Sequence, residues 1–253
     1  MAIESYTSLC DDFYLDICVN TELDLPNERD TVLAFFERIQ KQFPSMGSFY
    51  RRTGSEYCLE EDRTAGSCRW VSLDIDRIGS GLVNPSDFDE AYRQHRLVLE
   101  IIPYMLSVGH LDIDSLDVTF AMDFDCPGNH DDAIAEALLS QTAFSSLMDI
   151  PSAKPIACSP SMVVALSEDC YTQARCSIES RTSVYDPDKK NDIAGEAISL
   201  AFTVRQYPRG DTKFDSLRSF EKQRLLAEEL MAERVVPNFV QPLTEAIAHK
   251  RLT

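Results

Sequence analysis

Two segments of the sequence, residues 15–46 and 116–147, align with each other without a gap at a shift of 101 residues. Nine of the 32 aligned pairs are identical. Chance gives about two identical pairs, and this number is higher when the best of many shifts is chosen. Self-similarity over this length indicates a duplicated structural unit, and few folds accommodate one. The identical pairs are Leu15/Leu116, Asp16/Asp117, Asp24/Asp125, Pro26/Pro127, Asp30/Asp131, Ala34/Ala135, Gln40/Gln141, Phe43/Phe144 and Ser45/Ser146.

The pattern of apolar residues repeats together with the residue identities. Leu15, Ile17 and Val19 alternate with polar residues, and Val118 and Phe120 do the same in the second segment. Alternation with a period of two is typical of a strand with one buried face. In each segment a proline follows the strand, and apolar residues then recur at helical spacing.

The later parts of the two copies align only with gaps. Val71–Leu73 matches Ile198–Leu200, and Ser86-x-x-Asp89 and Thr212-x-x-Asp215 both have the spacing of a capping box before a long helix. The first copy is expected to contain a strand, a helix, three strands and a helix, at 12–23, 28–43, 47–53, 56–62, 68–77 and 86–107. The second copy is expected to follow the same order at 114–125, 129–142, 160–168, 171–183, 194–206 and 213–234, with a final helix at 239–250 after Pro237.

This element order predicts an α+β fold. We expect an internal duplication of a β-α-β-β-β-α unit, forming a largely antiparallel sheet with helices mainly on one face and a pseudo-twofold axis. Residues 1–110 would be the first repeat, and residues 111–253 the second repeat plus the C-terminal helix, packed as one body. The order of elements resembles duplicated effector-binding domains of bacterial regulators and the saddle of the TATA-binding protein, and neither family's motifs are present.

The charge of the chain argues against two classes of partner. With 253 residues, a formal net charge of -18 and a pI near 4.5, the chain lacks the basic clusters that bind nucleic acid, and anionic membranes would repel it. The sequence has no apolar run of about 18 residues and no signal-peptide pattern at its start. We therefore expect a cytoplasmic protein.

The eight cysteines predict neither disulfides nor a metal site. None forms a Cys-x-x-Cys pair, and the four histidines are scattered. Without a secretion signal a reducing compartment is expected, in which cysteines act as small buried hydrophobic residues. No phosphate loop, dinucleotide fingerprint or serine elbow occurs, so no cofactor is expected.

A surface of the expected sheet is the leading candidate for a binding site. Polar residues alternate with the apolar ones along the strands, so they would line an open face if the helices cover the other. We expect a non-catalytic binding or interaction protein, with a protein or small-molecule ligand on this open face or in a groove between the repeats. The candidate ligand-binding residues are Arg175, Glu179, Arg181 and Arg205.

Two other functions remain open. Cys126, His130 and Asp131 bring a thiol, an imidazole and a carboxylate to a helix start, which suits a small hydrolase or transferase. The competing interpretation is a helix cap formed by Asn129. Alternatively, the final helix could dock into an assembly, including a homo-oligomer, through an apolar stripe of Val235, Val236, Phe239, Val240 and Leu243.

Overall fold

A computed structural model describes residues 6–52, 55–62, 66–180, 197–210 and 213–252. The elements of the first half are β1 (Asp12–Thr21), α2 (Arg29–Gln42), β2 (Ser48–Arg51), β3 (Tyr57–Glu60), β4 (Cys68–Leu73), β5 (Arg77–Val83) and α3 (Phe88–Met105). Those of the second half are β6 (Ile113–Phe124), α4 (His130–Leu139), α5 (Ser145–Met148), β7 (Ser161–Ala165), β8 (Thr172–Ser180), β9 (Ile198–Gln206), α6 (Ser216–Leu230), the π-helix η2 (Met231–Val240) and α7 (Gln241–Leu252).

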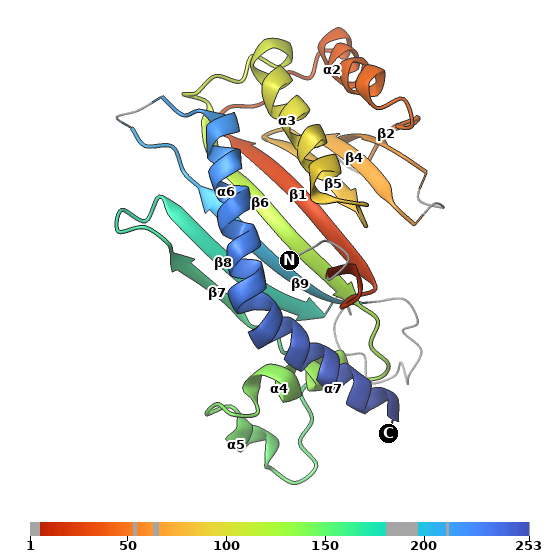
Figure 1. Cartoon of the computed structure of the whole chain (residues 1–253), viewed down its shortest axis with the longest axis vertical. Coiled ribbons are helices and arrows are strands. Elements are labelled where there is room, and N and C mark those ends of the chain that lie inside the picture. The colour runs from red at the N-terminus through yellow and green to blue at the C-terminus, as the bar shows by residue number, and fades with distance from the viewer. Residues whose placement is uncertain (1–5, 53–54, 63–65, 181–196, 211–212, 253) are drawn as a thin grey trace.

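One antiparallel sheet of nine strands organises the described chain, in the order β2-β3-β4-β5-β1-β6-β9-β8-β7 (Figure 1). The opening strands of the two halves, β1 and β6, pair directly with each other at its middle. On their other sides β1 pairs with β5, and β6 pairs with β9. The predicted α+β class with a large antiparallel sheet is confirmed.

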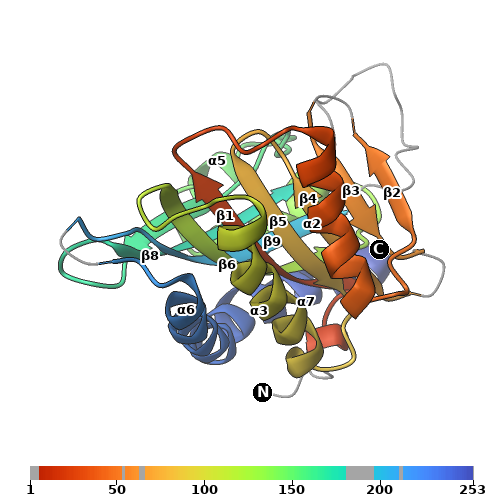
Figure 2. The same ribbon diagram turned by 90° about the horizontal axis from the view of Figure 1, so that it is seen from above.

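The core lies between this sheet and the long helices. Leu15, Ile17, Val118 and Phe120 are at most 1% exposed, as their alternation predicts. Helix α3 packs on β1 and β5, α6 packs on β6 and β9, and the two helices touch each other (Figure 2). Each fully buried apolar side chain contributes roughly 1.5–3 kcal/mol to folding, so the opening strands contribute much of the stability.

The first half contains a strand that the sequence pattern did not predict. Strand β5 makes this half β-α-β-β-β-β-α, so the expected β-α-β-β-β-α order is wrong there. The sequence pattern does not predict this strand because Gly79 and Gly81 interrupt the alternation of apolar and polar residues, and glycine is depleted in strands. The earlier alignment is also corrected, because Val71–Leu73 lies in β4, one strand away from the middle pair, whereas Ile198–Leu200 lies in β9, next to it.

The C-terminal helices differ from the expectation of a break at Pro237. Helix α6 continues through η2 into α7 without interruption. Proline has no amide hydrogen and clashes with the carbonyl four residues earlier, so wider π turns carry the chain past this residue. None of the helices in the described part of the chain has both the length and the apolar character needed to cross a membrane.

The predicted docking stripe of the final helix is buried within the chain's own core. Val235, Val236, Val240 and Leu243 are between 0% and 3% exposed, and Phe239 packs against the same core. The prediction that these residues dock onto a partner is therefore wrong. They are apolar because this helix packs against α4 and β9.

The helix starts confirm one predicted cap and revise another. Asn129 accepts a hydrogen bond from the amide of Asp132 at 3.2 Å, as expected for an N-cap. At α3 the cap is Asp87, which accepts from the Glu90 amide at 2.6 Å, while Ser86 donates to the Glu90 carboxylate. The predicted Ser86-x-x-Asp89 box is thus shifted by one residue.

Candidate functional site

The polar residues that alternate with the buried apolar ones along the strands project from the side of the sheet opposite α3 and α6. Residues paired across antiparallel strands project on the same side, so the register fixes which side chains meet there. We call this surface the open face. Its centre consists of Asp16 and Cys18 of β1, Asp117 and Thr119 of β6, and Thr203 and Arg205 of β9.

Arg205 and Asp117 form the main ion pair of the open face. They are directly opposite each other on β9 and β6. Nε and Nη2 of Arg205 donate to the two carboxylate oxygens of Asp117 at 2.6 and 2.5 Å, a bidentate fork that is stronger than a single contact. This hydrogen bonding raises the pKa of Arg205, and its guanidinium lies 5.8 Å from the ring centre of Tyr207.

Other polar residues of the open face also bond to one another. The hydroxyl groups of Thr119 and Thr203 are 2.8 Å apart. Asp123 accepts hydrogen bonds from Tyr14 at 2.8 Å and from Ser199 at 2.5 Å. These contacts cross three adjacent strands and fix the side chains of β6 and β9 in place.

Asp16 is the exception at the centre of the open face. Its Oδ1 is fully buried and has no hydrogen-bond partner among the described residues, although the residue as a whole is only partly buried. Burial raises its carboxyl pKa to about 8. An ideal Cβ built on Gly81, the residue opposite, would lie 2.0 Å from Asp16 Oδ1 and 2.4 Å from the Trp70 indole. The glycine therefore allows both side chains to approach the sheet.

Burial raises the pKa of six of the eight thiols. Burial, followed by the charge of Asp117, raises the pKa of Cys18 to about 12. Burial is the largest cause of a raised pKa at Cys10, Cys58, Cys126, Cys158 and Cys176 as well. A protonated thiol is a poor nucleophile and a poor metal ligand. Cys58, Cys68 and Cys158 are buried as expected, whereas Cys170 is exposed.

The predicted ligand-binding residues lie at different places on the open face. Arg205 is at the centre and is held by Asp117. Arg175 and Glu179 are exposed on β8, opposite Thr203 and Ser199 of β9, and Arg181 lies outside the described residues. The expected groove between the repeats is not found in the sheet, since β1 and β6 hydrogen-bond directly.

The predicted catalytic candidates do not converge on a shared site. His130 is 4% exposed, and its Nε2 and Nδ1 lie 2.9 Å from the Cys126 carbonyl and 3.1 Å from the Ser180 hydroxyl. Asp131 instead accepts from the Cys158 amide at 2.8 Å. The Cys126 thiol lies 3.7 Å from the Pro127 carbonyl. Each group thus stabilises the start of α4 or the segment beside it.

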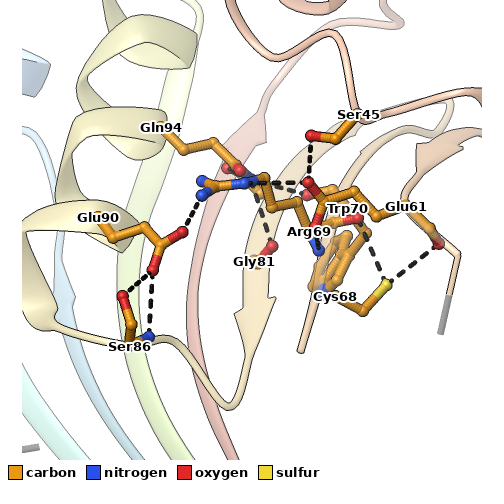
Figure 3. A network of polar contacts seen from close by, with 10 residues as sticks. Ser45, Glu61, Cys68, Arg69, Trp70, Gly81, Ser86, Glu90 and Gln94 are labelled. Carbon is orange, nitrogen blue, oxygen red and sulfur yellow. Dashed lines mark hydrogen bonds and ion pairs between the residues drawn. The ribbon is translucent and has the colours of Figure 1, made fainter. Parts of the chain in front are cut away.

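A buried ion network that the sequence pattern did not reveal lies on the helix side of β4. Figure 3 shows Arg69 between Glu61 and Glu90 of α3. Its Nε is 3.2 Å from Glu61, and its guanidinium lies 4.9 Å from the ring centre of Phe43. Arg69 is 9% exposed, so this network ties α3 to the sheet and is not open to a ligand.

Two surface hollows lie at opposite ends of the sheet, away from Asp16. The larger has a volume of about 340 Å³, and the smaller, beside α7, about 200 Å³. The larger one is lined by Glu22, Ile113, Asp114, Asp169, Cys170, Tyr171, Tyr207 and Pro208. Within the described ranges, no group of three or more His, Cys, Asp or Glu side chains is arranged to hold a metal ion.

Comparisons with known proteins do not identify a family. No family model matches the chain, and no curated protein matches it. One solved structure with some similarity is the di-domain ARO/CYC StfQ from the steffimycin biosynthetic pathway. It is 11% identical, with a TM-score of 0.20, over 88% of this chain and 95% of that one. A TM-score this low does not establish a shared fold and carries no information about function.

Proposed function

We propose that this chain is a non-catalytic binding protein whose ligand or partner contacts the open face of the sheet. The observation that carries the proposal is Asp16, a carboxyl group with one buried oxygen that has no partner among the described residues. Its neighbours on the open face are hydrogen-bonded to one another. Leaving a buried polar atom without a partner costs about 1–3 kcal/mol, and a ligand that interacts with the same carboxyl group from the open face would offset that cost.

The surroundings of the histidine and cysteine side chains favour a binding role over a catalytic one. Both ring nitrogens of His130 lie within hydrogen-bond distance of groups in its own surroundings. The other buried histidine, His95, is fully enclosed, and burial lowers its pKa to about 3. A neutral imidazole without access to solvent cannot exchange protons with a substrate. The raised thiol pKa values described above argue against cysteine nucleophiles.

An origin by duplication, with a pseudo-twofold axis, is part of the same proposal. Ile17 and Val118 are equivalent at the 101-residue shift, and they pair with each other across β1 and β6. A twofold axis between these two strands would require such a self-pairing. The middle of the open face would then be the place where the two repeats meet.

Two buried side chains, one in each long helix, support the proposal that the two halves are equivalent. Gln223 of α6 donates to the carbonyl groups of Leu116 and Val204. In the first half, His95 of α3 lies 3.0 Å from the Ser80 hydroxyl. Its Nε2 makes no hydrogen bond of standard geometry, although the Leu15 carbonyl is near enough to raise its pKa. Each helix therefore directs one polar group at the same strand position, Leu15 or Leu116.

We also propose the cytoplasm as the location. All eight cysteines are free of disulfide bonds, which supports a reducing compartment.

A bulky substitution on the open face tests the binding proposal. Ala201, partly exposed on β9 beside Ser177 and Ala121, is changed to tryptophan, and the matched control is Leu225→Trp at an exposed position of α6. The chains are incubated with lysate of the source cells, recovered and examined by native mass spectrometry. We expect a retained species with the wild type and Leu225→Trp, and its loss with Ala201→Trp. Equal retention by all three chains would contradict the proposal.

A further inference from the structure

Asp16 and Asp117 occupy matching positions but differ in their cross-strand partners. They are an identical pair at the 101-residue shift. Each lies opposite a residue of the next strand outward, Gly81 of β5 for Asp16 and Arg205 of β9 for Asp117. The guanidinium that neutralises Asp117 therefore has no counterpart beside Asp16.

The aromatic neighbours of the two carboxylates are also comparable. Arg205 lies over the Tyr207 ring while it binds Asp117. Beside Asp16, the indole of Trp70 lies against Gly79 and Gly81. A guanidinium favours a carboxylate together with an aromatic face, since it can form paired hydrogen bonds and stack at the same time. At Asp16 the carboxyl group and the aromatic ring are present without the cation.

Asp16 is partly exposed on the open face, which is the side from which a cation would approach it. Oδ1 is enclosed and has no hydrogen-bond partner among the described residues, and the second carboxyl oxygen belongs to the same group. The net charge of -18 attracts cations to the protein surface as a whole. A cation at Asp16 would supply the charge that Arg205 supplies to Asp117 within the chain.

We propose that Asp16 is a binding site for the guanidinium group of a ligand, with the indole of Trp70 as its second contact. This inference rests on the proposed binding function and gives it a ligand class. The guanidinium belongs either to a small molecule or to an arginine side chain of a protein partner. Both sources share the same recognition chemistry.

Trp70 provides a direct measurement, because it is the only tryptophan of the chain. The full chain is titrated at constant ionic strength with agmatine, with Gly-Arg-Gly amide and with Gly-Lys-Gly amide, and tryptophan fluorescence is recorded. We expect a saturable change with the guanidinium probes and about tenfold weaker binding of the lysine peptide. Tighter binding of agmatine indicates a small-molecule ligand, and tighter binding of the arginine peptide indicates an arginine side chain.

Two variants test the assignment to Asp16. Asp16→Asn is expected to weaken guanidinium binding about tenfold or more, while the exposed control Asp24→Asn removes the same charge and leaves binding unchanged. Thr119→Arg places a guanidinium on β6 opposite Asp16 and is expected to block the probes without removing the carboxylate. This second variant keeps the test valid if Asp16→Asn folds poorly.

The outcomes separate this inference from the binding proposal. Equal titration curves for the wild type, Asp16→Asn and Thr119→Arg, or no saturable change with any guanidinium probe, would overturn the guanidinium site. If a cellular species is still lost on Ala201→Trp in that case, the open face binds a ligand of another class. If the probes bind through Asp16 but Ala201→Trp retains the cellular species, the guanidinium site stands and the cellular species binds elsewhere on the chain.

Discussion

The carboxyl group of Asp16 has a raised pKa because folding removes it from water without supplying a partner. Burial is the only cause, and it moves the pKa from an ordinary value of 3.8 to about 8. The folded protein therefore holds this proton more tightly than the unfolded chain does. The stabilisation is fully present below the unfolded pKa and is lost as the pH rises through the folded pKa.

We expect the free energy of unfolding to fall between about pH 4 and about pH 8 because of Asp16, by on the order of a few kcal/mol. Asp16→Asn removes this titration, so its stability should vary less with pH and exceed that of the wild type at pH 9. Urea denaturation at pH 5 and pH 9 measures the difference, with Asp24→Asn as the control. If the free energy of unfolding of the wild type and of Asp16→Asn changed with pH in the same way, folding would not raise the pKa of Asp16.

At the scale of single elements, β5 depends on the absence of side chains at its glycines. A Cβ on Gly81 would lie within 2.0–2.5 Å of Asp16 and Trp70, whereas one on Gly109 would meet nothing within 4 Å. Gly81→Ala should therefore destabilise the protein by about 1–3 kcal/mol through overpacking, and Gly109→Ala should have little effect. Thermal unfolding of both variants compares the two positions, and equal melting temperatures would mean that β5 adjusts freely.

The elements that could be predicted from the sequence are those in which one periodicity dominates. Strands β1 and β6 alternate regularly because one face is buried by helices and the other is polar, and Asn129 caps α4 through an ordinary local contact. Strand β5 escaped detection because its two glycines give no hydrophobic signal. The π-helix could not be predicted because a proline such as Pro237 normally ends a helix. The structure shows that the helix continues through this residue, with buried neighbours on both sides of it.

The candidate site was only partly predictable for a related reason. Alternation placed Asp16, Asp117 and Arg205 on the polar side of their strands, but a single sequence does not state the register between strands. The register puts Arg205 opposite Asp117 and Gly81 opposite Asp16. The Arg69 network was missed for the same reason, since Glu61 follows β3 and Glu90 lies in α3.

At the scale of the whole molecule, the two halves share both their sheet and their core. The β1·β6 ladder runs from Asp12 to Thr21. Beneath it, Tyr6, Phe13 and Phe88 of the first half surround Phe120 of the second, with ring centres 6.0–6.4 Å from that of Phe120. Tyr92 of α3 likewise contacts Phe220 of α6. Separating the halves would expose these aromatic rings and a long sheet edge together.

We therefore expect residues 1–110 and 111–253 to be unstable as separate chains. An exposed central strand such as β1 or β6 has a full row of free backbone groups and one apolar face, which favours aggregation over a folded monomer. Size-exclusion chromatography and circular dichroism of each half, and of an equimolar mixture refolded together, measure this. The mixture should recover the cooperative unfolding of the intact chain, because it restores the β1·β6 ladder and the shared aromatic cluster. If either half alone is a monomer that unfolds cooperatively at the temperature of the intact chain, the repeats are independent domains, and the packing between them contributes little to stability.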